Sequence, residues 1–196
     1  MKKLKTIFTC TIIFICSIKN LKAQSEYIVT LQNDTIKGEI KNYLEDRVKF
    51  IPEGSIERVR YKATEIKAFH VKLKKEEIDL EAIKLPGKRK ALFVNRVLSG
   101  KIILYELIET FVRYNGGVSH AVTWYVKKLD QDIVEIKTSE LSFNRKERED
   151  AFFVLLKDNP KVAEQYQNGG KFSFDFIKSI INAYNQSSML IINLNI

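Results

Sequence analysis

Residues 91–107, with the sequence ALFVNRVLSGKIILYEL, form the longest apolar run after the amino terminus and lie in the middle of the chain. β-Branched and aromatic side chains fill this stretch on both sides of Ser99 and Gly100, a pair that is typical of a turn. The pattern predicts two paired strands whose faces are both largely buried, because a surface helix would show a polar stripe every three to four residues. A buried helix over residues 101–112 is the alternative that the same apolar run allows.

The amino terminus has the three-part layout of a secretory signal peptide over residues 1–23. Residues 1–5 carry three lysines, residues 6–18 form an apolar run without a charge, and the small residue Ala23 precedes Gln24. A membrane-spanning helix needs about 20 apolar residues, so this run is too short to be one. We therefore expect cleavage near Ala23 and Gln24 and an exported product, periplasmic or secreted, without a transmembrane span. An uncleaved membrane anchor is the alternative.

Both cysteines, Cys10 and Cys16, lie inside that apolar run. The residues before them, Thr9 and Ile15, are not the small residue that normally precedes the lipidated cysteine of a bacterial lipoprotein, so we do not expect lipidation. Cleavage leaves 173 residues without a thiol for a disulfide, a nucleophile or a metal site. A chain of this size must then be stabilised by an ordinary hydrophobic core.

Cleavage also changes the net charge of the chain. The whole chain has 33 basic and 24 acidic residues and a net charge of +9. Five lysines and no acid leave with residues 1–23, so 28 basic and 24 acidic residues remain, a net charge of +4. This mild positive charge argues against nucleic acid as a partner.

Residues 24–75 have the pattern of a small antiparallel β unit. Alternating apolar residues before and after the polar residues 32–35 predict a hairpin, because Asn and Asp tolerate the left-handed backbone of a tight turn. Further elements are predicted in this order: strands at 47–51 and 59–61, a helical turn at 63–66 and a strand at 69–73. Short strands separated by turn residues are typical of a small sheet or a barrel-like unit.

Residues 76–196 are predicted to continue as a central sheet and to end in helices. Strands at 78–83, 121–129 and 133–136 accompany the central hairpin, and the apolar period then changes to that of helices. Three helices are predicted: one over 147–156, one over 161–167 after Asn159 and Pro160, and one after Ser173 that reaches Tyr184. Residues 189–196 are either a last strand or loosely ordered.

These patterns together predict an α+β fold. An antiparallel β-rich N-terminal and central part is followed by about three short C-terminal helices. We expect the segments 24–75 and 76–196 to pack against each other as one compact module.

Three motifs taken together are similar to a family of uncharacterised exported proteins from Bacteroidetes-type bacteria. They are residues 33–40 (NDTIKGEI), residues 97–106 with Val-Leu-Ser-Gly-Lys and Leu-Tyr-Glu, and residues 183–185 (AYN). The resemblance covers most of the chain after the signal and implies a β-rich front followed by short helices. Its motifs consist of turn and core residues, so it implies no catalytic residue. Family members often have a Cys near the Asn-Pro helix start, where this chain has Asp158 and Asn159.

The sequence contains no recognisable catalytic, metal or cofactor motif. His70 and His120 are fifty residues apart and neither has the spacing of a metal ligand pair. No Gly-x-Ser-x-Gly elbow is present, and Ser119 beside His120 would point to the opposite face of a strand. We therefore expect no metal site, no cofactor and no catalytic residue that the sequence can name.

Two binding candidates remain. The turn with Lys88, Arg89 and Lys90 gathers cations that could meet an acidic polymer or phosphate groups, although a solvated loop is the simpler interpretation because acidic residues lie nearby. Trp124 is a candidate for lining a sugar or peptide groove, and a core position is its simpler interpretation.

Two functional hypotheses follow. The first is a non-enzymatic binding or structural module of the cell envelope, which contacts an envelope protein or an acidic polymer through a sheet edge or the basic turn. The alternative is a hydrolase that acts on a cell-wall or dietary polymer. It would use two carboxylates that the fold brings about 5 to 10 Å apart.

Overall fold

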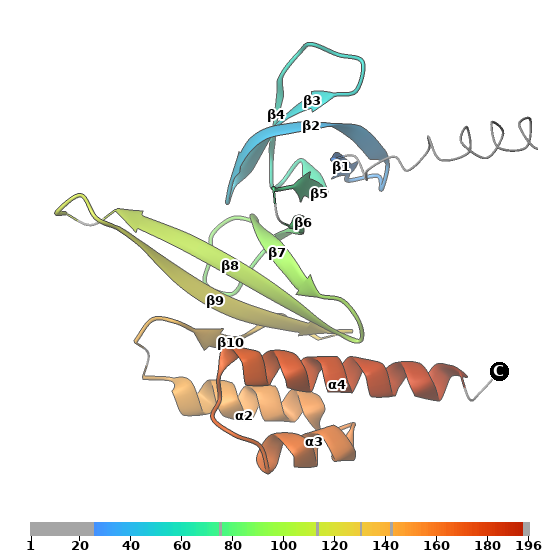
Figure 1. Ribbon diagram of the computed structural model, residues 1–196, viewed down its shortest axis with the longest axis vertical. Helices are drawn as coiled ribbons and strands as arrows, with labels where there is room; N and C mark the ends of the chain where they lie inside the picture. The colour runs from blue at the N-terminus through green and yellow to red at the C-terminus, as the bar shows by residue number, and fades with distance from the viewer. Residues whose placement is uncertain (1–25, 75, 113, 130, 142, 194–196) are drawn as a thin grey trace, which may run out of the picture.

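The computed structural model describes residues 26–193 except 75, 113, 130 and 142. In this part the chain forms a ten-stranded antiparallel sheet followed by three helices (Figure 1). The predicted α+β fold with a β-rich front is therefore confirmed. The predicted signal peptide lies outside the described residues, and no described helix is both long and apolar enough to cross a membrane.

The strands follow one another as a meander with a single insertion, in the order β10-β9-β8-β7-β6-β5-β1-β2-β3-β4. β1 lies between β2 and β5, and the predicted first hairpin is confirmed as β1 and β2 with Asn33 in the left-handed region at φ 71°. The strands are β1 Tyr27–Thr30, β2 Thr35–Leu44, β3 Arg47–Pro52, β4 Val59–Lys62, β5 Ile66–Lys72, β6 Glu77–Ile83, β7 Leu92–Leu98, β8 Ile102–Val112, β9 Val118–Lys128 and β10 Val134–Thr138.

The central stretch forms the predicted pair of strands, β7 and β8, joined by a turn at residues 99–101. The alternative of a buried helix over residues 101–112 is wrong, because β8 pairs with β9 along its whole length, from Ile102↔Lys128 to Val112↔Val118. Over its first half β8 is buried on both faces. Leu104 packs into the core under the helices, and Leu107 packs into a smaller cluster on the opposite face.

Three helices cover one face of β8, β9 and β10 (Figure 1): α2 Arg145–Leu156, α3 Pro160–Gln167 and α4 Phe174–Asn193. The predicted caps are confirmed, because the Asn159 side chain accepts from Val162 N–H and the Ser173 hydroxyl accepts from Phe176 N–H. The core between helices and sheet contains mainly aliphatic strand residues together with apolar residues from all three helices, of which Phe152 on α2 and Tyr184 on α4 are the largest.

The alternative of a last strand over residues 189–196 is wrong for residues 189–193, which the structure describes as helical. α4 continues to Asn193, and residues 194–196 lie outside the described part. The sequence after Tyr184 contains neither Gly nor Pro, so no residue there ends the helix.

The first seven strands enclose a second core. Strand residues such as Ile28, Phe50 and Phe69 are fully or almost fully buried in it. The sheet curls so far that the turn between β2 and β3 returns to β7, where the Phe93 N–H donates to the Glu45 carbonyl oxygen over 2.6 Å. The ladder between β5 and β6 joins the segments that the sequence divided at residue 75, so both belong to one sheet.

Gly38, in the first of the three motifs named from the sequence, allows the close approach of β2 and β3. A Cβ atom at this position would lie 2.1 Å from the Ile51 carbonyl oxygen and 2.4 Å from the Phe50 ring. We expect Gly38→Ala to lower the free energy of unfolding by at least about 1–3 kcal/mol, because the core and the partner strand must shift. Urea unfolding measures the change.

Gly170→Ala is the matched control for this prediction. A Cβ atom at Gly170 would have no neighbour within 4 Å, so this variant should unfold like the wild type or slightly later. Equal urea midpoints for the Gly38 and Gly170 variants would contradict the close approach described for β2 and β3.

Candidate functional site

β8 loses its neighbour on one side halfway along its length. β7 pairs with β8 only from Leu98↔Leu104 to Asn95↔Glu106, whereas β8 continues to Val112. On the other side, the pairing of β9 with β10 ends at Thr123↔Thr138. Residues 108–112 and 118–121 therefore project from the sheet as a two-stranded arm (Figure 1).

The free edge of the arm can be assigned from the alternation of backbone groups in an antiparallel strand. The N–H and C=O of Ile102 point away from β9 and bond to the Asn185 side chain over 2.9 and 2.8 Å. The same groups of Ile108 and Thr110, six and eight residues later, then point the same way. Val122, opposite Ile108, agrees with this, because its N–H and C=O point away from β8 and bond to Ser139.

The backbone groups of Ile108 and Thr110 thus point to the side that β7 has left. Within the described residues, neither a strand nor a side chain bonds to them there. A free edge of this kind is a template for pairing with another strand.

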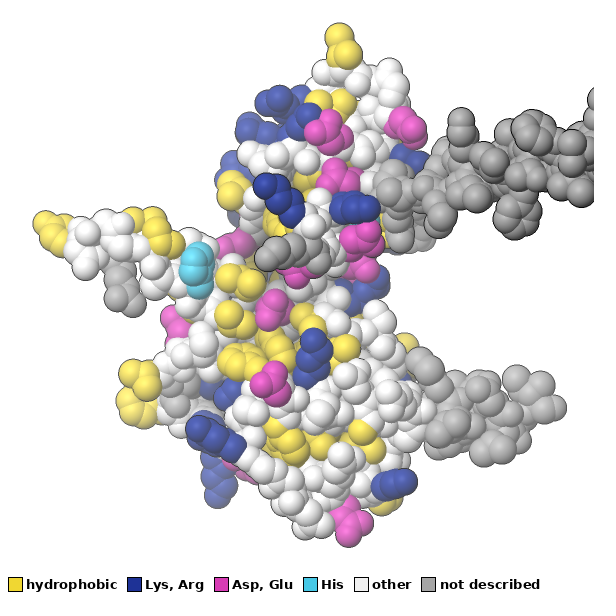
Figure 2. Space-filling model, viewed as in Figure 1, with side chains coloured by type: hydrophobic (Ala, Val, Ile, Leu, Met, Phe, Trp, Pro, Cys, Tyr) yellow, Lys and Arg dark blue, Asp and Glu magenta, His cyan; other side chains and the backbone are white. Residues whose placement is uncertain are grey.

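A cleft with a volume of about 490 Å³ lies along this edge. One wall is the edge of β8 with Ile108 and Thr110, and the other is the turn between β2 and β3 with Leu44 and Glu45. Hydrophobic and acidic side chains lie next to each other at this waist of the molecule, where the arm leaves the body (Figure 2). The remaining lining residues are Tyr43, Glu76, Ile78, Leu80, Phe93, Asn95, Glu106 and Leu107.

The polar groups of the cleft are mostly acidic. Two hydrogen bonds orient the Glu106 carboxylate: the Trp124 indole N–H donates to it over 2.9 Å, and the Asn95 amide donates over 3.5 Å. Burial, and after it the charge of Glu109, raise the pKa of Glu45 above its ordinary value, while Lys88 acts to lower it. The cleft is therefore electronegative and partly removed from water.

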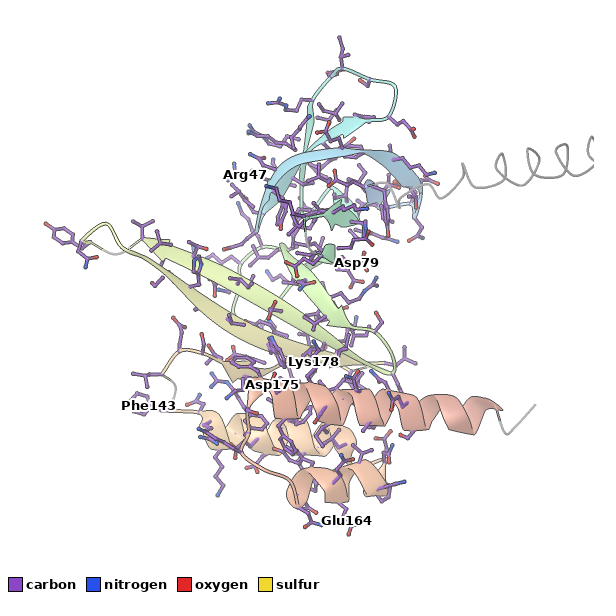
Figure 3. The ribbon with its side chains drawn as sticks, in the orientation of Figure 1. Arg47, Asp79, Phe143, Glu164, Asp175 and Lys178 are labelled. Atoms are coloured by element: carbon purple, nitrogen blue, oxygen red, sulfur yellow. The ribbon has the colours of Figure 1, made fainter. Side chains whose placement is uncertain are left out.

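The end of the arm is apolar and exposed. Val112, Tyr114 and Val118 contact little of the rest of the described chain, and the tip is hydrophobic in Figure 2. Phe143, in the loop between β10 and α2, is exposed too and points away from the body on the same side (Figure 3). The arm thus presents contact surface beside the free edge of β8.

The basic turn named from the sequence lies on the opposite face of β8. Lys88 is half-buried and forms an ion pair with Glu109, whereas Arg89 and Lys90 are exposed. One of the three candidate cations is therefore already neutralised by this chain.

Trp124 lies in the core, which was its simpler interpretation. It is 6% exposed, and its ring meets the Phe174 ring edge to face at 4.8 Å. It does not line the cleft, but it orients Glu106, which does.

A polar row crosses the other face of the sheet, with Asp79 at its centre (Figure 3). His70 is 4% exposed, stacks on Tyr27 and places Nδ1 2.8 Å from the Asp79 carboxylate. The Arg96 guanidinium forms ion pairs with two carboxylates, that of Asp79 at 3.3 Å and that of Glu81 at 2.6 Å. Burial acts to raise the pKa of Asp79, but His70 and Arg96 outweigh it and hold this pKa below its ordinary value. The row connects β5, β6 and β7 by polar contacts, and Tyr27 joins β1 to it by stacking on His70.

The described residues do not bring the two histidines into one site. His70 is on β5, and His120 is on the arm, where its Nδ1 lies 3.0 Å from the Thr110 hydroxyl. No group of three or more potential metal-ligating side chains occurs in the described part of the chain.

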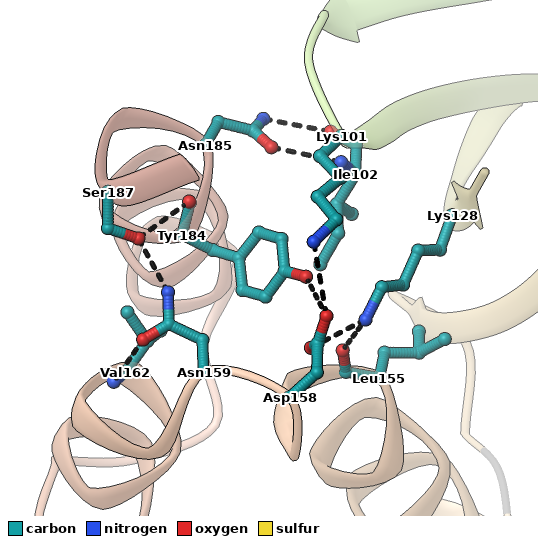
Figure 4. A network of polar contacts seen from close by, with 10 residues as sticks. All are labelled: Lys101, Ile102, Lys128, Leu155, Asp158, Asn159, Val162, Tyr184, Asn185 and Ser187. Carbon is teal, nitrogen blue, oxygen red and sulfur yellow. Dashed lines mark hydrogen bonds and ion pairs between the residues drawn. The ribbon is translucent and has the colours of Figure 1, made fainter. Parts of the chain in front are cut away.

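Residues 97–106 and 183–185, two of the three motifs named from the sequence, meet in a buried network (Figure 4). The Asn185 amide bonds to both backbone groups of Ile102 and, over 3.3 Å, to the Ser99 carbonyl oxygen. Gly100 allows this approach, because a Cβ atom there would lie 2.4 Å from the Asn185 amide. The motif residues therefore fasten α4 to the turn between β7 and β8.

Asp158 completes this network from the loop between α2 and α3. Its carboxylate lies 2.6 Å from Lys128 and 3.3 Å from Lys101 and accepts from the Tyr184 hydroxyl over 2.7 Å. Burial acts to raise the pKa of Asp158, but these three partners lower it to about 2. Asp158 is ionised at neutral pH and holds the helices to β8 and β9.

No family model, curated protein or solved structure matches the chain. Sequence reasoning named neither wall of the cleft. It did consider a sheet edge as a binding surface, but which edge stays unpaired depends on the register of distant strands. A glutamate inside the apolar run of β8, Glu106, was the one local signal that could have indicated the cleft.

We expect Asn185→Ala to lower the free energy of unfolding by about 2–4 kcal/mol, because it leaves the buried Ile102 N–H and C=O without partners. Gln186→Ala, at the exposed next position of α4, is the control and should stay within about 0.5 kcal/mol of the wild type. Urea unfolding measures both. A loss for Asn185→Ala no larger than that for Gln186→Ala would refute the fastening role of this amide.

Proposed function

We propose that this chain is an exported, non-enzymatic binding module of the cell envelope that takes an extended segment of a partner protein along the free edge of β8. The observation that supports this most is that β7 leaves β8 at Glu106, so that backbone groups of Ile108 and Thr110 line an open cleft without a partner. Strand addition to such an edge is a recurring mode of peptide recognition.

The cleft supplies the two components that this mode requires. Main-chain bonds to the edge provide affinity, at about 0.5–1.5 kcal/mol net for each bond. Alternate side chains of the added strand would point into the cleft, where Leu80 and Phe93 form an apolar floor, and these contacts provide specificity.

Export is the part of this proposal that rests on the sequence alone. Residues 1–23 have the layout of a cleavable signal, and both cysteines lie within them. An envelope protein is then the natural source of the bound segment. Binding of an acidic polymer to the basic turn has weaker support, because Lys88 is paired with Glu109.

A hydrolase is the second candidate, and one observation favours it. Glu45 and Glu106 line the same cleft, and the pKa of Glu45 is raised, as a general acid requires. The apolar floor and the free strand edge favour binding over this alternative, since a polymer hydrolase would gain nothing from unpaired backbone groups.

Selection of binding peptides from a displayed heptapeptide library on the purified exported chain tests the proposal. We expect peptides with micromolar dissociation constants that bind Thr110→Pro at least about 10-fold more weakly, because proline removes the edge N–H. Thr110→Ala is the matched control, since it keeps this N–H and, like the proline variant, loses the bond to His120.

Proline is tolerated at a solvent-facing edge position, and circular dichroism verifies the fold of both variants. Selected peptides that bind the proline and alanine variants equally well would contradict strand addition at β8. A selection that yields no binding peptide would contradict it as well.

A further inference from the structure

The cleft beside β8 contains carboxylates but no cation. Glu45, Glu76 and Glu106 line it, and neither Lys nor Arg is among the residues of its walls. The chain as a whole is positively charged, so this acidic lining differs from the rest of the molecule. Lys88, whose charge acts to lower the pKa of Glu45, forms an ion pair with Glu109 on the other face of β8.

The two inner carboxylates are poorly compensated. Both hydrogen bonds to Glu106 come from neutral donors, Trp124 and Asn95, and no cation pairs with it within the described residues. Burial and the nearby Glu109 raise the pKa of Glu45 despite the opposing charge of Lys88, so its ionised form is disfavoured. A positive charge beside either carboxylate would offset this penalty.

Glu106 lies where the strand proposed above would begin, so its negative charge would face that strand. Glu106 is the last residue of β8 that pairs with β7, so an added strand would begin next to it. A side chain that points into the cleft there faces the carboxylates, and the side chain two positions along faces the apolar floor with Ile78 and Leu80. A long basic side chain can lay its aliphatic stem on Leu44 or Phe93 and keep its charge at the carboxylates.

We propose that the segment bound along β8 carries a Lys or Arg that pairs with the carboxylates lining this cleft, two positions from an apolar residue that contacts its apolar floor. This inference rests on the proposed function and specifies the chemistry of the partner. The partner is an extended basic and apolar segment, and an acidic segment is excluded from this cleft by like-charge repulsion.

Three synthetic peptides test the inference. They alternate threonine and valine over seven positions, with valine at the second and sixth positions, and carry lysine, glutamine or glutamate at the fourth. Calorimetry with the exported chain should give a dissociation constant for the lysine peptide about 10-fold below that of the glutamine peptide and lower still relative to the glutamate peptide. The preference should shrink as salt is added.

Glu45→Gln keeps the backbone carbonyl that accepts from Phe93 and removes only the charge. It should reduce the preference for lysine over glutamine to less than about 3-fold. Glu57→Gln, in the exposed loop between β3 and β4, is the matched control and should leave the preference unchanged.

The outcomes distinguish the inference from the proposed function. If the lysine and glutamine peptides bind equally and both bind Thr110→Pro more weakly, the charge inference is overturned and strand addition stands. If the glutamate peptide binds best, the charge inference is likewise overturned. If none of the three peptides binds, both the inference and the proposed function are overturned.

Discussion

The structure depends on the backbone hydrogen bond between the Phe93 N–H and the Glu45 carbonyl oxygen. Asn95 pairs with Glu106, so backbone alternation directs the Phe93 N–H toward the side on which β8 lies. The turn between β2 and β3 occupies this group, and β7 cannot continue its ladder along β8. One bond therefore closes the curled half of the sheet and leaves the edge of β8 unpaired.

The start of β8 is fixed to the helices, whereas its other end is exposed. Its start is fixed to α4 by Asn185, and its neighbour Lys128 on β9 is fixed to the helices by Asp158 (Figure 4). Its other end projects as an arm with an apolar tip. A rigid base and an uncovered edge suit an element that receives another strand, because the edge is already extended before it binds.

Local patterns in the sequence predicted the hairpins, the helix caps and the fold class, because alternation, turn residues and capping residues act over a few positions. Local patterns did not predict features that depend on the length of an element or on contacts between distant residues. The end of α4 is one example, because the helix continues past Tyr184 to Asn193. The free edge of β8 could not be located, since it follows from a contact between Glu45 and Phe93, which are far apart in sequence. Trp124 was named from the sequence as a candidate for lining a groove, with a core position as the simpler interpretation, and it lies in the core, where its indole N–H donates to Glu106.

Amide hydrogen exchange, resolved by residue with NMR, tests the unpaired edge most directly. In the free chain the amides of Ile108 and Thr110 should exchange rapidly, while those of Leu107 and Glu109, which point to β9, are protected. A bound strand peptide should protect Ile108 and Thr110 as well. Protection of these two amides before any peptide is added, or rapid exchange that a bound peptide leaves unchanged, would contradict the account.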